Sequence, residues 1–208
     1  MIIDLHNHSI KSDDARAKVE NYCQWIRKRG LALDGFVLTE HRQYDDESDY
    51  RPLEDESGIL ILKGSEVETD YGHVLVFGVN DDMRHAFDFT QIGLDCSQVV
   101  SEVKRCGGIA VPCHPGRTKV GMMAHVEARG EVEGVEVIET LNGGSRGTEN
   151  EDAIALASRL GYRGIGGSDA HIVSHIARCA TKFEDDIRNV DQLVSALRDG
   201  KYEAIEWR

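Results

Sequence analysis

Short apolar runs alternate along the chain with longer stretches in which apolar residues recur at helical spacing. The short runs are bounded by Gly, Asp or Pro and have the length of buried strands. They lie at Ile2–Leu5, Phe36–Thr39, Ile59–Leu62, Val74–Val79, Ile109–Cys113, Val135–Ile138 and Gly164–Ile165. Amphipathic helices are predicted between several of them, at Val19–Arg29, Val99–Arg105, Asn150–Leu160 and Val190–Asp199. The pattern therefore predicts an α/β fold.

Strands that alternate with helices predict a parallel sheet. About seven strands in a chain of modest length favour a closed or nearly closed barrel over an open doubly wound sheet. A dinucleotide-binding sheet is excluded at Gly164–Asp169, because its fingerprint requires glycine where Asp169 stands. The segment from about Ala180 to Trp207 has a strand-like start and end around a helix, and we expect it to pack against the barrel without contributing ligands.

Length and charge narrow the class of protein. The 208 residues fit one barrel better than two separately cored domains, so we expect residues 1–208 to form one domain. A formal net charge of -13 argues against binding along long duplex nucleic acid, although a bound cation cluster could make one pocket positive and attract small or terminal phosphates. The start of the chain lacks a secretory signal and no run reaches membrane-spanning length, so we expect a cytoplasmic protein without membrane contact.

The five cysteines argue against a disulfide framework. Their number is odd and none forms a C-x-x-C pair, which also argues against a zinc ribbon. Cys113 lies in a predicted buried strand, and we expect it to be a small core residue rather than a nucleophile.

Histidines and acids gather where the predicted strands end. The first strand ends in His6 and His8, whose side chains share one face because alternate residues of a strand point the same way. Such a pair can bind one cation, yet taken alone it is common without one. The same residue types recur at later strand ends, in Glu40, His41, Glu66, His114, Asp169 and His171. His73 opens the fourth strand, and Asp13 follows in the first loop.

Six of the nine histidines thus sit beside predicted strand ends. We expect the other three, His85, His125 and His175, to be surface residues. Loops after the strands of a parallel barrel open on one face, where distant ligands converge. Imidazoles with carboxylates favour zinc, manganese or iron and argue against magnesium or calcium as the sole metal. The pattern therefore predicts a site for more than one divalent transition-metal ion.

These motifs resemble those of PHP-domain phosphoesterases, a family named after polymerases and histidinol phosphatase. The resemblance runs in the family's order from residue 4 to residue 171. It is carried by Asp4–His8, Ser12–Asp13, Thr39–His41, Gly64–Glu66, Gly72–His73, His114–Pro115 and Gly167–His171. It implies a distorted (β/α)7 TIM-like barrel of the PHP type that binds up to three metals.

The resemblance also implies how the ligands are grouped. One ion would be bound by His6, His8, Glu66 and Asp169. A second would be bound by Glu66, His73 and His114, which makes Glu66 a bridging carboxylate. A third would be bound by Asp13, His41 and His171. In such a cluster we expect a metal-bridging hydroxide as the nucleophile, with Glu66 and Asp169 holding the ions and with His171 or a metal-bound water as the proton donor.

Two further residues are candidates for substrate binding. Arg117 closes the turn after His114, and a guanidinium suits a phosphate oxygen. Asn142 resembles a family position near the active face, although an Asn-Gly pair also forms turns. Arg42, Arg146 and Arg178 rank below Arg117, because their loops leave their directions undetermined.

The function that follows is the hydrolysis of small phosphomonoesters, such as nucleotides or amino-alcohol and sugar phosphates, or of nucleic-acid ends. A metal-dependent amidohydrolase is an alternative, but such enzymes usually carry a ligand lysine on a middle strand, and neither Lys63 nor Lys104 has that position. A non-catalytic regulatory module is a second alternative, in which the ions have no open coordination position.

Overall fold

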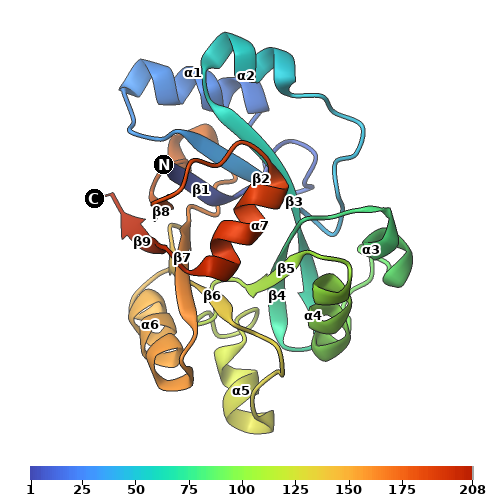
Figure 1. Cartoon of the computed structure of the whole chain (residues 1–208). Helices are drawn as coiled ribbons and strands as arrows, with labels where there is room; N and C mark the ends of the chain where they lie inside the picture. Colours follow the sequence, from blue (N-terminus) through green and yellow to red (C-terminus); the bar gives the residue numbers. More distant parts are fainter. Residues whose placement is uncertain (208) are drawn as a thin grey trace.

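Seven strands form one curled sheet in the order β5-β4-β3-β2-β1-β8-β9. In this computed structural model, which describes residues 1–207, the strands are β1 (Ile2–Asn7), β2 (Gly35–His41), β3 (Leu60–Thr69), β4 (Gly72–Phe77), β5 (Ile109–Pro112), β8 (Cys179–Phe183) and β9 (Tyr202–Glu206). A separate parallel pair, β6 (Val137–Asn142) and β7 (Arg163–Gly167), lies against β5 on one side and β1 on the other. The result is a curled half-barrel with helices around it (Figure 1).

The sheet is mixed, whereas the alternation of strands and helices predicts a parallel one. β1, β2 and β3 are parallel, but β4 runs antiparallel to both β3 and β5. Only Asp70 and Tyr71 separate β3 from β4, and so short a connection joins antiparallel strands. Gly72 follows this turn with a φ of 104°, where a side chain would also collide with the carbonyl oxygen of Val120.

Within residues 1–207, seven α-helices surround the sheet. They are α1 (Val19–Arg29), α2 (Arg51–Ser57), α3 (Asp81–Ala86), α4 (Cys96–Arg105), α5 (Met123–Arg129), α6 (Glu149–Leu160) and α7 (Val190–Asp199). The bounds of α1 and α7 are those predicted from periodicity. The side chains of Asp95 and Asn189 accept hydrogen bonds from the backbone at the starts of α4 and α7. Helices α2, α3 and α5 have only six or seven residues, too few to show a clear period.

One end of the half-barrel is closed by the apolar face of the amphipathic helix α7. Leu193, Val194 and Leu197 of α7 are buried in the same cluster as Leu75 and Phe77 of β4. In Figure 1, α7 lies across the front of the sheet, with α1 and α2 at the top of the view. Because α7 fills this end, the other ends of the strands are left for polar side chains.

Within residues 1–207, every helix is too short or too polar to cross a membrane.

Candidate metal centre

Side chains on six strands, or just after them, meet in one group. The group lies at the carboxyl ends of β1, β2, β3, β5 and β7 and at the amino end of β4. We call it the strand-end cluster. Its members are His6, His8, His41, Glu66, His73, His114, Asp169 and His171, eight of the nine residues predicted as metal ligands. His73 opens the antiparallel β4, so it reaches the same end of the sheet as the others.

The backbone bends sharply where strands deliver these side chains. Four non-glycine residues among those described have positive φ, and three of them are Arg42, His114 and Asp169. Non-glycine residues in this region are strained by about 1–3 kcal/mol each and are concentrated at functional sites. The surrounding packing therefore holds these strand ends in a conformation that local preferences would not select.

Glu66 lies at the centre of the cluster with about 1% of its side chain exposed. Its Oε2 is 3.0 Å from His6 Nε2, 3.2 Å from His8 Nε2 and 3.2 Å from His41 Nδ1. Three ring nitrogens thus face one oxygen.

The second oxygen of Glu66 is just as crowded. Its Oε1 is 2.7 Å from His73 Nδ1, 3.2 Å from His114 Nε2 and 3.4 Å from the sulfur of Cys113. A carboxylate offers about four lone-pair positions in all, and six ligand atoms surround this one. The carboxylate therefore cannot accept a hydrogen bond from each of the six atoms. Cations between the carboxylate and the rings would give every one of these atoms a partner.

The surroundings of His8 test whether a cation lies between the rings and the carboxylates. Its ring is fully buried, and neither nitrogen makes a hydrogen bond within the described part of the chain. Yet Nε2 lies 3.2 Å from Glu66 Oε2 and 3.3 Å from Asp169 Oδ1. Ligand atoms about 2.1 Å from a tetrahedral ion are about 3.4 Å apart. The spacing therefore fits a shared cation among His6, His8, Glu66 and Asp169, whose ligand atoms all lie within 4.8 Å of one another.

The charges in the cluster also favour a bound cation. Burial would raise the pKa of Glu66, but His6 and the hydrogen bonds from His114 and His73 hold it well below its ordinary value. Burial works against protonation of His8, but Asp169 and Glu66 outweigh it and raise the pKa of His8 to about 9. The carboxylates thus stay ionised and attract positive charge, which a metal ion can supply in place of a proton.

A second group lies nearer the surface, around His41 and His171. Their Nε2 atoms are 3.3 Å apart, and His8 completes the set of rings. Burial lowers the pKa of His41 to about 4, which keeps its ring neutral and able to bind a cation.

The acid beside this pair is Asp14, not the Asp13 of the sequence prediction. The carboxylate of Asp14 is 3.5 Å from His41 Nε2 and 3.2 Å from His171 Nε2. The side chain of Asp13 is 75% exposed and lies 3.2 Å from the guanidinium of Arg42. The two aspartates are adjacent in a turn, so the turn geometry decides which of them faces the rings.

Glu139 of β6 is a buried acid that the sequence analysis missed. Its Oε1 lies 3.0 Å from His6 Nδ1, and its Oε2 accepts hydrogen bonds of 2.8 Å from the backbone of His114 and from the side chain of Asn142. Such a partner orients the ring so that its other nitrogen can face a metal. The only sequence signal was that an acid directly follows the predicted strand Val135–Ile138.

Two other buried acids brace the loops instead of facing the rings. Asp4 accepts hydrogen bonds from the backbone of Ser168 and Ala177, and burial raises its pKa to about 6. Glu40 accepts hydrogen bonds from the backbone of Ser9 and from the hydroxyl of Ser12. Both acids therefore tie the loops that carry cluster residues to the sheet.

A cavity of about 600 Å³ opens beside the cluster. Arg117 lines it, and its Nη2 donates to Asp169 Oδ2 at 2.7 Å and to Asn142 Oδ1 at 2.8 Å. Arg146, Arg178 and His175 also line the cavity, so His175 lies nearer the cluster than the sequence indicated. His85 and His125 belong to short helices and do not line it.

The sequence of this chain is similar to a family model and to one curated protein. Residues 147–202 match a family model described as PHP-associated. An uncharacterised protein of Methanocaldococcus jannaschii is 25% identical over 125 residues, which cover 55% of this chain and 68% of that protein.

Solved structures share the fold at low identity. A two-domain protein of Bacteroides vulgatus, described as containing a predicted PHP-like metal-dependent phosphoesterase, aligns with a TM-score of 0.66 and 21% identity over 99% of this chain and 64% of its own. The chain thus spans less than two thirds of that protein. A lesion-specific endonuclease of Pyrococcus furiosus aligns with a TM-score of 0.69 and 12% identity, over 98% and 57% of the two chains. An amidohydrolase of Chromobacterium violaceum aligns with a TM-score of 0.66 and 16% identity, over 98% and 97%.

Proposed function

We propose that this chain is a member of the PHP-domain family and a metal-dependent phosphoesterase that hydrolyses small phosphomonoesters or the phosphates at nucleic-acid ends. The observation that carries the proposal is the buried carboxylate of Glu66 with five imidazoles around it. No common structural role requires so many rings about one acid. A polynuclear metal site does.

The donor atoms divide into three groups that fit divalent zinc, manganese or iron. The first group is His6, His8, Glu66 and Asp169, the second is Glu66, His73 and His114, and the third is His41 and His171 with Asp14 in the position expected for Asp13. Ions bound there would polarise a phosphoryl oxygen and lower the pKa of a bound water.

The chain's own residues would bind and orient the substrate. Arg117 lies at the edge of both the cluster and the cavity, where its guanidinium would donate to a phosphate oxygen. Asn142 accepts from Arg117 and donates to Glu139, so both ends of its amide are used within the protein. We therefore assign Asn142 to the positioning of Arg117 instead of to direct substrate contact.

His171 is the candidate proton donor to the leaving group. Its side chain is 27% exposed and lines the cavity, so a bound ester could reach it. Its Nδ1 lies 3.0 Å from the carbonyl oxygen of Asp169, which fixes the ring and turns Nε2 away from the backbone. Because Nδ1 donates to this carbonyl, Nε2 carries a proton only when the ring is an imidazolium that binds no ion. His171 would therefore donate to the leaving oxygen only while the third group holds no ion, and with an ion there the proton would come from a water molecule.

Charge favours small substrates. Arg117, Arg146 and Arg178 line the cavity, against Glu149 and Asp169. The chain as a whole has a net charge of -13, which repels a long polyanion. We therefore propose that the interior of a long duplex is a poor substrate, although the fold is shared with an endonuclease.

Neither lysine considered for the amidohydrolase alternative lies where it could bind a metal ion. Lys63 donates to the carbonyl oxygen of Ser48, and Lys104 lies 3.4 Å from Glu136. Neither ammonium group faces the strand-end cluster, which supports the assignment of ester hydrolysis.

Turnover across a metal panel tests the proposal. Protein stripped with a chelator and reloaded with zinc, manganese or iron should hydrolyse an aryl phosphate and nucleotides faster than a duplex without phosphorylated ends or an N-acyl amino acid. Arg117→Ala should lower kcat/KM roughly 10- to 100-fold, the value of a hydrogen bond to a charged group. Arg188→Ala, on the opposite side of the molecule, is the control. Amide hydrolysis without phosphatase activity would overturn the proposal.

A further inference from the structure

We infer that Cys113 is a sulfur ligand of the metal ion on the Oε1 side of Glu66, and that it makes this position prefer zinc to manganese. The inference rests on the proposed metal centre. It assigns a chemical role to a residue that the sequence pattern placed in the core, and it makes the two ion positions on either side of Glu66 chemically different.

The geometry places the thiol among the ligand atoms. Cys113 directly follows β5 and is fully buried. Its sulfur lies 3.4 Å from Glu66 Oε1 and 3.4 Å from His114 Nε2, and those two atoms are 3.2 Å apart. With His6 they form a group in which every ligand atom lies within 4.8 Å of the others.

A tetrahedral ion would fit this triangle. Zinc binds sulfur at about 2.3 Å and imidazole nitrogen at about 2.1 Å, which puts the two ligand atoms about 3.6 Å apart. The observed distance between the Cys113 sulfur and His114 Nε2 is 3.4 Å.

A hydrogen bond from the thiol explains the contact less well. Glu66 Oε1 already lies 2.7 Å from His73 Nδ1 and 3.2 Å from His114 Nε2. An oxygen with two lone pairs has no room for a third donor, and a thiol is a weak one. The sulfur therefore has more to gain from a cation that it shares with this oxygen.

The other cysteines have no such surroundings. Cys23, Cys96, Cys106 and Cys179 fall in no group of three or more potential ligands within residues 1–207. The group around Glu66 Oε2, formed by His6, His8 and Asp169, holds no sulfur either. His6 belongs to both groups, but the sulfur contacts Glu66 at Oε1, 3.4 Å away, and so lies on one side of the bridging carboxylate.

This asymmetry has a chemical consequence. Thiolate is a soft ligand that favours zinc, whereas manganese prefers oxygen ligands. When the ion binds, the S–H bond of Cys113 breaks, its proton passes to solvent and a sulfur–metal bond forms. The Oε1 side should therefore retain zinc when the Oε2 side accepts manganese.

Cobalt substitution tests the inference by absorption, independently of activity. The chelator-stripped full chain is titrated with Co²⁺. Visible d–d bands report that the ion is bound, and a near-ultraviolet charge-transfer band reports a sulfur ligand. We expect both in the native chain, loss of the charge-transfer band alone in Cys113→Ser, and retention of both in Cys106→Ser, a partly exposed cysteine at the end of α4. In dialysis against mixed zinc and manganese, Cys113→Ser should retain less zinc relative to manganese than the native chain.

The other possible results would contradict the sulfur ligand, the selectivity for zinc or the metal centre itself. Visible bands without the charge-transfer band in the native chain, or a band that survives in Cys113→Ser, would overturn the sulfur ligand and leave the proposed function intact. An unchanged ratio of zinc to manganese in Cys113→Ser would overturn the selectivity. No cobalt bands at all would overturn both the sulfur ligand and the metal centre. Thermal unfolding of Cys113→Ser, compared with Cys113→Ala, checks that the fold survives.

Discussion

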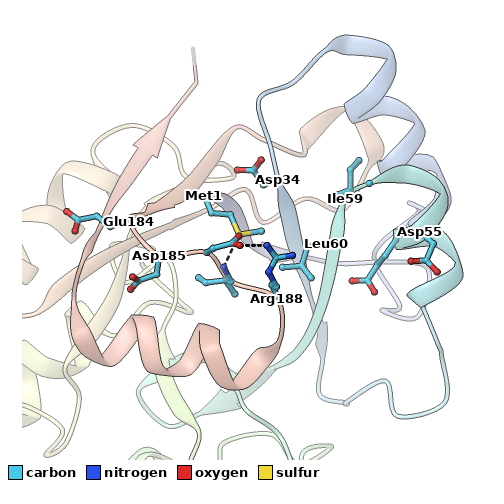
Figure 2. Close-up of a pocket in the computed structure, with 12 residues that line it drawn as sticks. Met1, Asp34, Asp55, Ile59, Leu60, Glu184, Asp185 and Arg188 are labelled. Carbon is cyan, nitrogen blue, oxygen red and sulfur yellow. Dashed lines mark hydrogen bonds and ion pairs between the residues drawn. The ribbon is translucent and has the colours of Figure 1, made fainter.

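The two ends of the strands both gather carboxylates, but only one end surrounds them with imidazoles. At the carboxyl ends, Glu66 and Asp169 are buried among histidine rings. At the amino ends of β1, β2 and β3, where the antiparallel β8 ends, a cavity of about 600 Å³ is lined by Asp34, Asp55, Glu184 and Asp185, together with Met1 and Arg188 (Figure 2). The cavity beside the strand-end cluster also has a volume of about 600 Å³, so volume does not distinguish the two ends.

The difference lies in what the acids contact. At the amino ends, the acids are largely exposed, and several serve the backbone: Asp34 accepts from the amide of Ile2 and Glu54 from that of Ile61. At the carboxyl ends, each oxygen of Glu66 faces three ligand atoms. An acidic surface is common without a ligand, whereas buried rings around a buried acid are not. The comparison supports our proposal that the chemistry takes place at the carboxyl ends.

Glu66→Gln should have the largest effect. The amide keeps the shape of the side chain but removes the charge and replaces one acceptor oxygen by an NH2 donor, so bound ions on both sides of residue 66 should be lost. We expect metal-dependent turnover to fall by more than the roughly 10- to 100-fold that loss of an outer hydrogen-bond partner costs. Elemental analysis and kcat measure the effect, and Glu184→Gln at the opposite cavity is the matched control. Full metal content in Glu66→Gln would break the comparison.

Glu139→Gln should weaken metal binding without removing a ligand. A glutamine amide can donate to His6 Nδ1, which would leave the proton on Nε2 and block that nitrogen from the ion. We expect zinc affinity to fall about 10- to 100-fold in chelator competition. Glu136→Gln, which changes an acid paired with Arg163 near the start of the same strand, should leave the affinity unchanged. Equal affinities for the two variants would show that Glu139 does not position His6.

Asp45→Asn should alter stability rather than metal binding. Burial alone would raise the pKa of Asp45, but Lys11, Tyr50 and Ser48 lower it to about 2. The contribution of the Asp45 carboxylate to the free energy of unfolding is therefore complete above the unfolded-state pKa near 3.9. It is lost as the pH falls through 2. The variant should lose about 1–2 kcal/mol of unfolding free energy at neutral pH, with a smaller difference in acid. Denaturant unfolding at several pH values measures it, and a constant difference down to pH 2 would contradict this account.

The acids of the opposite cavity should have the smallest effect. Asp55→Asn combined with Asp185→Asn removes two charges from exposed positions that contact no imidazole. We expect unfolding free energy to change by less than about 0.5 kcal/mol, with unchanged metal content and turnover. A loss of bound metal in this double variant would mean that the cavity in Figure 2 holds an ion of its own.

The strands and much of the cluster could be predicted because their signals are local. Apolar runs mark β1 and β2, and helical periodicity gives the bounds of α1 and α7. Histidines and acids at strand ends needed only the rule that the loops of a parallel barrel open on one face. Residues from β1 to β7 meet there in spite of the reversed β4, because His73 stands at the start of that strand rather than at its end.

What the sequence did not reveal depends on packing between distant segments or on turn geometry. Neither Asp13 nor Asp14 is distinguished by its neighbours in sequence, and the turn alone directs Asp14 to the rings. The role of Glu139 depends on how β6 lies against His6, which is 133 residues away. Cys113 has the pattern of a core residue, and only the position of Glu66, 47 residues away, places its thiol among ligand atoms.

The central claim is that the strand-end cluster binds several metal ions, and metal stoichiometry tests it most directly. Protein expressed with supplements of manganese and zinc should contain two or three transition-metal ions per chain by elemental analysis. His6→Ala combined with His8→Ala should remove at least one of them, because both rings face Glu66 Oε2 and Asp169 Oδ1. A folded native chain that contains no metal and binds none in calorimetric titration would contradict the account.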